Sequence, residues 1–214
     1  MYFEIVAARL DVGVERVAAL SARLSDAERR RAERFRFERD RRRYVVARGR
    51  LRELLGERTG EDPRAVELVY GRNGKPALAQ PGLHFSVSHR AELVAYAFAP
   101  GREIGVDLEA VRPLPDADDI AARFFSRHEN ETYRGLAPRD RTLGFFNCWT
   151  RKEAFVKALG DGLSMPLDDF GVSLAPGERP EVLQIAGVCG DGGWRLHSFA
   201  PQAGFIAAVA IPPR

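Results

Sequence analysis

A pair of acidic residues inside an apolar segment, GREIGVDLE at 101–109, is the pattern in this sequence that most directly suggests chemistry. If residues 103–109 form a β-strand, Asp107 and Glu109 lie on one face, because successive side chains alternate between faces. Neighbouring carboxylates repel each other, so a protein usually exposes such a pair or neutralises it with a cation. Mg²⁺ is the natural candidate, since it is commonly held by one or two carboxylates with phosphate oxygens and water. From this pair alone, a solvated strand end is the simpler interpretation, and a third ligand would favour a metal.

A third acid occurs in FFNCWTRKEAFVKAL at 145–159. A helix drawn at 100° per residue places Lys152 and Glu153 inside its apolar arc. Burying an unpaired charge costs several kcal/mol, so each needs a metal, a ligand or an opposite charge as partner. Lys157, four residues after Glu153, is the ordinary helical partner for that acid. That pairing leaves Lys152 unexplained, and Glu153 remains a candidate third metal ligand.

Four further residues could hold an anion. Lys75 follows the turn formers Asn73 and Gly74 in GRNGKP and precedes Pro76, which stiffens the loop. Ser88 and His89 end the expected strand FSVSHR, where adjacent side chains point to opposite faces, a poor arrangement for a nucleophile and its base. They fit better as hydrogen-bond donors to an anion, although a structural role is the more usual one for an isolated histidine. Arg48 lies at the edge of the apolar face of a long helix, where a partly buried guanidinium could grip a phosphate.

The elements that position these residues follow from periodicity and turn chemistry. Ser25 and Glu28 predict a capping box before a long helix that runs to about residue 58, with an interruption near 37–40. Apolar runs separated by Gly, Pro and Asn predict strands. The expected helices are 117–124, 128–135 and 139–159, and the expected strands are 2–8, 66–70, 83–87, 93–98, 104–108, 170–174, 181–186, 194–199 and 205–211. Helices followed by strands occur twice, which predicts an α+β fold of two similar halves, residues 1–111 and 112–214.

Composition excludes several classes of protein. The 214 residues are 45% hydrophobic and 29% charged, which is typical of a globular chain with a sizeable core. The start, MYFEIVAARLDV, lacks the pattern of an export signal, and no window reaches the roughly 18 apolar residues of a membrane span. Cys148 and Cys189 form no CxxC motif, which disfavours a disulfide framework or a zinc site. We therefore expect a cytoplasmic protein in which Cys148 is a buried structural thiol.

The charge distribution is uneven although the net charge is only +3. Twelve arginines lie between Arg29 and Arg52, against three acidic residues. Such a segment attracts an anion, which could be a nucleic acid, a phosphorylated small molecule or an acidic protein.

Five segments, taken in order, resemble the successive motifs of the Sfp-type phosphopantetheinyl transferases. They are GKPAL (74–78), FSVSH (85–89), GVDLE (105–109), FFSRHE (124–129) and WTRKEAFVKALGDGL (149–163). Each motif alone is weak, but five in the right order over about 90 residues, after an arginine-rich helix, make chance matching improbable. The likeness continues through PLDDF.

The resemblance implies a monomeric α+β fold with a pseudo-twofold axis and an active site in the cleft between the halves, holding coenzyme A and Mg²⁺, with Mn²⁺ as an alternative. It implies that Asp107, Glu109 and Glu153 ligate the metal. It also implies phosphate contacts from Arg48, Lys75, Ser88, His89, Lys152 and Lys157, with Arg31 or Arg43 as additions. Arg90 departs from the family pattern, in which a small hydroxyl residue often follows the histidine, and Asn147 and Cys148 stand where more apolar residues are common.

The implied reaction is attack by a serine of an acyl or peptidyl carrier protein on the β-phosphate of coenzyme A, releasing adenosine 3′,5′-bisphosphate. Asp107, Glu153 and Lys157 are the expected catalytic residues, with Glu153 accepting the serine proton and Lys157 stabilising the leaving phosphate. Carrier proteins of this family are typically acidic, and the arginine-rich helix together with residues 117–135 would offer them a complementary surface.

Two other functions are weighed against this one. A nucleic-acid-binding module would explain the arginines but predicts interleaved exposed aromatics beyond Phe35 and Phe37, and it leaves the three carboxylates unexplained. A homologue that binds coenzyme A or carrier protein without catalysis is disfavoured by the intact carboxylates. Which carrier or pathway the enzyme serves, and whether acylated coenzyme A is accepted, cannot be deduced from these motifs.

Overall fold

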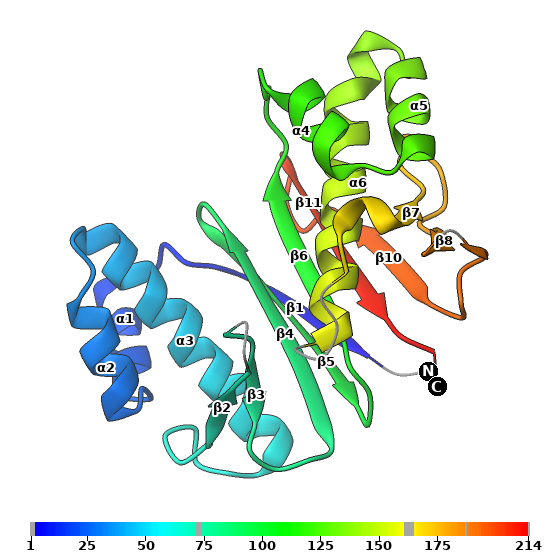
Figure 1. The fold of residues 1–214 in the computed structure, drawn as a ribbon. Helices are drawn as coiled ribbons and strands as arrows, with labels where there is room; N and C mark the ends of the chain where they lie inside the picture. Colours follow the sequence, from blue (N-terminus) through cyan, green and yellow to red (C-terminus); the bar gives the residue numbers. More distant parts are fainter. Residues whose placement is uncertain (1–2, 72–73, 161–164, 187, 214) are drawn as a thin grey trace.

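The computed structural model describes residues 3–71, 74–160, 165–186 and 188–213 (Figure 1). In chain order the elements are β1 (Glu4–Arg9), α1 (Val14–Ser21), α2 (Asp26–Glu33), α3 (Glu38–Thr59), β2 (Leu68–Tyr70), β3 (Pro76–Leu78), β4 (Leu83–Arg90), β5 (Leu93–Pro100), β6 (Gly105–Ala110), α4 (Ala117–Phe124), α5 (Arg127–Gly135), α6 (Pro138–Leu159), η2 (Leu167–Asp169), β7 (Phe170–Val172), β8 (Val182–Ile185), β9 (Val188–Cys189), β10 (Arg195–Phe199) and β11 (Phe205–Ile211). Helix and sheet are mixed, and the predicted α+β class is confirmed.

Two three-stranded antiparallel sheets share one strand order. In the first, β1 pairs with β5 and β5 with β4; in the second, β6 pairs with β11 and β11 with β10. The opening strand of each unit therefore pairs with its closing strand. A helix of 22 residues accompanies each sheet, α3 with the first and α6 with the second (Figure 1). The same supersecondary pattern is thus used twice.

The strand β6 belongs with the second sheet. The expected boundary near residue 111 placed this strand in the first half, but its backbone partner is β11, from Gly105 opposite Ala210 to Ala110 opposite Phe205. The division by sheet pairing therefore falls between Pro100 and Gly105. The sequence pattern identified the strand correctly and could not identify its partner, because strand pairing is decided by contacts far apart in the chain.

Two serines join the sheets where β4 and β6 lie side by side (Figure 1). The hydroxyl of Ser86 accepts a hydrogen bond from the backbone N–H of Val106 at 3.1 Å, and the hydroxyl of Ser88 accepts one from Leu108 at 3.3 Å. Side-chain oxygens thus take the place of a backbone ladder at this junction. Because hydroxyls can accept and donate at once, they also remain available to neighbouring groups.

The hydrophobic core has separate clusters on the two sheets. Leu51, Leu54 and Leu55 of α3 pack with Phe85, Tyr96 and Phe98, whereas Ala154, Phe155 and Ala158 of α6 pack with Ile206, Ala208 and Phe170. The remaining faces of β5, β6 and β11 form a third cluster rich in alanine and valine. Each long helix is therefore fixed on its own sheet. The polar residues between the two units are held by these two separately packed helix-and-sheet layers.

The helix boundaries largely follow the sequence signals. Ser25 and Glu28 form the predicted capping box, in which each side chain bonds the other residue's backbone N–H. The arginine-rich segment divides into α2 and α3, with the break at residues 34–37. Helix α1 and the short strands β3 and β9 were not predicted; each has at most eight residues and too few periodic positions to be distinguished from a loop.

Within the described residues, no helix is both long and apolar enough to cross a membrane.

Candidate active site

Asp107 lies at the centre of the junction between β4, β6 and α6. Its Oδ1 accepts hydrogen bonds from the hydroxyl of Ser88 at 3.0 Å and from the ammonium of Lys157 at 2.6 Å. Its Oδ2 is buried and has no hydrogen-bond partner in the protein. The carboxylate side chain is only 8% exposed. A buried oxygen without a partner costs about 1–3 kcal/mol, and more when it carries charge, so this oxygen calls for a ligand.

Gly105 explains how α6 comes so close to β6. A Cβ atom at this position would lie 2.5 Å from the backbone nitrogen of Ala158 and closer still to the carbonyl oxygen of Ala154. No other residue type fits without moving the helix. The absence of a side chain therefore brings the last turns of α6, which carry Glu153 and Lys157, directly over the strand that carries Asp107.

Glu109 and Glu153 complete a group of mutually repelling carboxylates. Burial raises the pKa of Glu153, and the charges of Asp107 and Glu109 raise it further against the opposing effect of Lys157. Burial likewise raises the pKa of Glu109, against Arg90 and with a contribution from Asp107. The pKa of Glu153 thus responds to both other acids and that of Glu109 responds to Asp107, as expected for neighbours on one strand and the facing helix.

These residues fit Mg²⁺ in chemistry and charge. All three donors are carboxylate oxygens, which hard cations prefer, and Oδ2 of Asp107 is free to bind one. As the side chains stand, the described parts of the chain contain no group of three or more His, Cys, Asp or Glu residues close enough together to hold a metal. Lys157 supplies the positive charge on Oδ1 of Asp107.

Arg90 has a partner that the sequence did not reveal. Its Nε lies 3.0 Å from a carboxylate oxygen of Glu109. The side chain of Glu109 is mostly buried, and that of Arg90 is partly exposed. The residue that departs from the family pattern therefore reaches one of the candidate metal ligands. It partly neutralises that acid.

A cavity of about 510 Å³ opens among the helices and strands of the first unit. It lies between α2, α3, the start of β3 and the end of β4, and its walls include Arg31, Tyr44, Arg48, Pro76, Val87 and His89. His89 lies in the cavity wall, and burial, followed by the charge of Lys157, lowers the pKa of its imidazole. The lining combines cations with apolar surface, which suits a ligand that has both phosphate and nonpolar parts.

Two buried polar atoms on the cavity wall lack partners. Nη1 of Arg48 and the hydroxyl of Tyr44 make no hydrogen bond in the protein. Arg48 is 13% exposed, with its Nε 3.5 Å from Oε1 of the buried Glu28 and its guanidinium over the ring of Tyr70. The sequence prediction of a partly buried Arg48 at the helix edge is confirmed. Its free nitrogen is the kind of donor that an anion would satisfy.

Lys75 and Ser88 are engaged with protein groups. Nζ of Lys75 lies 2.8 Å from Glu103, 2.8 Å from the carbonyl oxygen of Lys157 and 3.3 Å from that of Ile104. The hydroxyl proton of Ser88 goes to Asp107. Either residue would have to exchange these bonds to hold a phosphate.

Lys152 lies away from the site. It is fully buried, and its Nζ contacts Glu129 at 2.8 Å and the carbonyl oxygens of Leu167 and Phe170 at 2.7 and 2.6 Å. The expected phosphate contact from this lysine therefore has no support in the structure, since all three donors have partners inside the second half. Its partners therefore explain how the charge of Lys152 can be buried on α6.

Several supporting residues were missed because their partners lie far away in sequence. Glu129, fully buried, pairs with Lys152 and also accepts the backbone N–H groups of Ser126 and Val172. Glu28 accepts Nε of Arg52 at 2.5 Å as well as capping α2. The capping-box pattern S-x-x-E at 25–28 and 126–129 was the available signal, but it does not reveal the second role of each glutamate.

Neither of the unusual residues Asn147 and Cys148 reaches the site. Nδ2 of Asn147 donates to the carbonyl oxygen of Leu174 at 3.0 Å. Cys148 is a free, buried thiol whose pKa is raised well above its usual value, chiefly by burial. The expectation of a structural thiol is confirmed.

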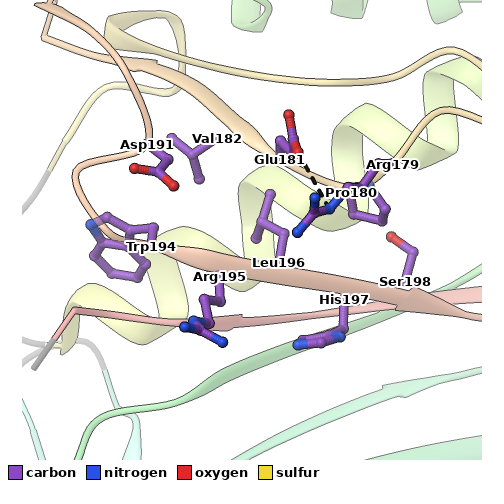
Figure 2. Close-up of a pocket in the computed structure, with 10 residues that line it drawn as sticks. All are labelled: Arg179, Pro180, Glu181, Val182, Asp191, Trp194, Arg195, Leu196, His197 and Ser198. Carbon is purple, nitrogen blue, oxygen red and sulfur yellow. Dashed lines mark ion pairs between the residues drawn. The ribbon is translucent and has the colours of Figure 1, made fainter.

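A second cavity, of about 430 Å³, lies between β8 and β10 (Figure 2). Figure 2 shows Leu196 and Ser198 on one side of β10 and Arg195 and His197 on the other, with the Arg179–Glu181 ion pair within the segment that precedes β8. None of the predicted site residues lines it. Of these two cavities, the one lined by Arg48 and His89 is therefore the one whose wall includes predicted site residues.

Comparison with known proteins agrees with the motifs. The profile described as 4′-phosphopantetheinyl transferase superfamily matches residues 103–210, and the profile described as 4′-phosphopantetheinyl transferase, N-terminal, matches residues 14–101. The chain is 39% identical over 206 residues to the 4′-phosphopantetheinyl transferase HetI of Nostoc sp., covering 94% of this chain and 84% of that one. It is 32% identical over 152 residues to the 4′-phosphopantetheinyl transferase Sfp of Bacillus subtilis, covering 71% and 66%.

The fold and the site thus define an enzyme of group transfer, with two sheet-and-helix units meeting at a polar junction. The chain belongs to the 4′-phosphopantetheinyl transferase superfamily, in its Sfp-type branch, as the ordered motifs predicted. The two profiles meet between residues 101 and 103, the same place at which the sheet pairing divides the chain.

Proposed function

We propose that this enzyme transfers the 4′-phosphopantetheine moiety of coenzyme A to a serine of an acyl or peptidyl carrier protein, with Mg²⁺, releasing adenosine 3′,5′-bisphosphate. The observation that carries the proposal is the buried carboxylate of Asp107, which has one oxygen on Lys157 and the other free. A separate cavity lined by Arg31, Arg48 and His89 supports a site for phosphates in the same enzyme.

Coenzyme A would bind in the cavity between α2, α3 and β4. Arg48, Arg31 and His89 offer positive or hydrogen-bonding groups to its phosphates, while Pro76 and Val87 offer apolar contact to its nonpolar parts. The free Nη1 of Arg48 and the free hydroxyl of Tyr44 would gain partners on binding. Ser88 would contribute mainly by orienting Asp107.

Asp107, Glu109 and Glu153 would hold the metal, with Mn²⁺ as an alternative to Mg²⁺. When bound, the cation supplies charge neutralisation at the transferring phosphoryl group. It would also relieve the mutual repulsion that raises the pKa values of Glu109 and Glu153. Arg90 would share Glu109 with the metal and so weaken that ligand relative to Asp107.

The chain's own residues would then position the reacting groups and neutralise the charge that develops on them. The serine oxygen of the carrier attacks the β-phosphorus, a new P–O bond forms, and the bond from that phosphorus to the bridging oxygen breaks. Glu153 would accept the serine proton, directly or through water. Lys157, already poised with its ammonium 2.6 Å from Asp107, would stabilise the negative charge that develops on the leaving bisphosphate.

The carrier would approach the arginine-rich surface of α2 and α3 and the helices α4 and α5. Phe37 is 59% exposed beside this basic segment, which gives an acidic carrier both charge complementarity and an apolar contact. We propose an acidic carrier rather than nucleic acid because a nucleic-acid-binding role would leave the carboxylates of Asp107, Glu109 and Glu153 unexplained.

The decisive experiment is the intact mass of a purified apo carrier protein after incubation with the enzyme, coenzyme A and Mg²⁺. A gain of about 340 Da, one phosphopantetheine, is expected, and the gain should vanish with EDTA and with Asp107→Ala. Restoring activity with Mn²⁺ after EDTA treatment would support the metal assignment. No gain with several unrelated carriers, from folded protein that binds coenzyme A, would favour a binding homologue without catalysis.

A further inference from the structure

Three segments that are distant in sequence meet at the ammonium of Lys75. The lysine immediately precedes β3, the carboxylate of Glu103 and the carbonyl oxygen of Ile104 immediately precede β6, and the carbonyl oxygen of Lys157 lies in the last turn of α6. Nζ is 2.8 Å from both Glu103 Oε2 and Lys157 O, and 3.3 Å from Ile104 O. Its three protons therefore have three acceptors, one from each of these residues.

The contact with Lys157 caps a helix. The last four carbonyl groups of an α-helix lack intrahelical partners, and α6 ends at Leu159, so the carbonyl of Lys157 is one of these groups. A cation at a helix C-terminus is also favoured by the helix dipole. Lys75 thus binds the backbone of the same residue whose side chain binds Asp107.

Glu103 fixes the capping lysine from the opposite side. One carboxylate oxygen accepts the ammonium of Lys75, and the other lies 2.9 Å from Nδ1 of His84 on β4. Burial, the largest single influence, would raise the pKa of Glu103, but the bonds and charges of Lys75 and His84 together outweigh it and the pKa is lowered. The carboxylate is therefore charged at neutral pH and bridges β4 to the lysine.

We propose that Glu103 is a positioning residue for the transfer reaction: it holds Lys75 on the last turn of α6 and thereby sets the place of the Lys157 ammonium at Asp107. The inference rests on the proposed function. It also changes the role expected for Lys75, which acts on the enzyme's own helix instead of on a phosphate of coenzyme A.

The chain of contacts predicts a particular kinetic result. Replacing Glu103 by alanine frees Lys75 and loosens the turn, so Lys157 is misplaced in the transition state while the coenzyme A cavity stays intact. We expect Glu103→Ala to lower kcat about tenfold with the KM for coenzyme A changed by less than about twofold. Lys75→Met should behave alike, and the double variant should be no worse than Lys75→Met, because the two residues act as a unit.

Two further variants make the test specific. Glu103→Gln keeps an oxygen acceptor for Lys75 and should retain activity within about threefold of the parent. Glu181→Ala removes a partly exposed acid of similar exposure, paired with Arg179 at 3.3 Å in the second cavity, and should leave both constants unchanged. Circular dichroism melts of all variants check that each is folded.

The opposite pattern would overturn the proposal. If Lys75→Met raises the KM for coenzyme A about tenfold with kcat preserved, while Glu103→Ala has no effect, Lys75 is a direct phosphate ligand. Comparable losses in Glu181→Ala would show a general effect of removing a surface charge and would also overturn it.

A parent enzyme that transfers nothing to any carrier would contradict the proposed function, and the positioning claim would then be decided separately. Amide hydrogen exchange in the last turn of α6 should be about tenfold faster in Glu103→Ala than in Glu181→Ala if Glu103 supports the cap. Equal exchange in the two variants would overturn the positioning role itself.

Discussion

The ammonium of Lys157 and the carboxylate of Asp107 are 2.6 Å apart, and they connect the last turns of α6 to the central residue of β6. The lysine occupies one carboxylate oxygen and leaves the other buried without a partner. This asymmetry allows a single aspartate to orient a cationic side chain and to bind a metal at the same time. The expected consequences of the site follow from that division.

Asp107→Asn should reduce transfer at least about 100-fold. The amide keeps the shape of the side chain but loses the charge that holds Lys157 and that would hold the proposed metal. Rates measured by carrier mass gain over a series of Mg²⁺ concentrations would test this, with Asp62→Asn, whose carboxylate bonds its own loop, as a matched control. Unchanged rate and unchanged Mg²⁺ dependence would remove Asp107 from the metal site.

Arg48→Met should weaken coenzyme A binding by about 10- to 100-fold, because a charged hydrogen bond contributes about 1.5–3 kcal/mol. Calorimetric titration without carrier isolates this effect. Arg41→Met is the control on the same helix, since Arg41 pairs with Glu38 and does not line the cavity. Equal affinities for Arg48→Met and Arg41→Met would show that the unpartnered nitrogen of Arg48 does not meet the ligand.

Lys152→Met should cost stability and leave ligand binding intact. Removing the lysine leaves the fully buried carboxylate of Glu129 without its counter-charge, which typically destabilises a protein by about 3–5 kcal/mol. Urea unfolding measures the loss, and the double variant Lys152→Met with Glu129→Gln should recover part of it. A Lys152→Met protein with normal stability and lost coenzyme A affinity would return the lysine to the phosphate site.

The stability of the enzyme should fall with acidification through His89. Burial and Lys157 lower the pKa of this imidazole in the folded protein below the usual value of about 6.5. The unfolded chain then binds more protons in the window just below that value, so the histidine's contribution is present above about pH 6.5 and is lost as the pH falls. The melting temperature of the parent should drop more steeply between about pH 7.5 and 5.5 than that of His89→Gln. Parallel curves would contradict this assignment.

The sequence predicted local features well and long-range partners poorly. The capping box at Ser25, the helix end near residue 159 and the buried Arg48 all follow from patterns within one or two helical turns. The pairing of β6 with β11 and of Lys152 with Glu129 depends on residues that meet only after folding. The sequence pattern indicated a strand that carries Asp107 and Glu109, but it could not indicate that this strand pairs with β11.

In the candidate site, too, the sequence indicated which residues matter but not which groups they contact. Motif resemblance named Lys75, Ser88 and Lys152 together as phosphate ligands, but the structure gives each a different partner: the end of α6, Asp107 and Glu129. A motif reports that a residue type is needed at a position. It does not report whether the residue meets the ligand or supports one that does, because both roles constrain the side chain equally.

The two sheets share one strand order, which raises the question of how many coenzyme A molecules one chain can bind. In the first unit, Glu4 of β1 pairs with Arg58 of α3, just as Asp107 of β6 pairs with Lys157 of α6 in the second. The strands differ in their acids, because β1, EIVAAR, contains a single acid, whereas β6, GVDLEA, contains both Asp107 and Glu109. The strand with two acids therefore occurs in one of the two units. We expect each chain to bind one coenzyme A and to load one carrier at a time.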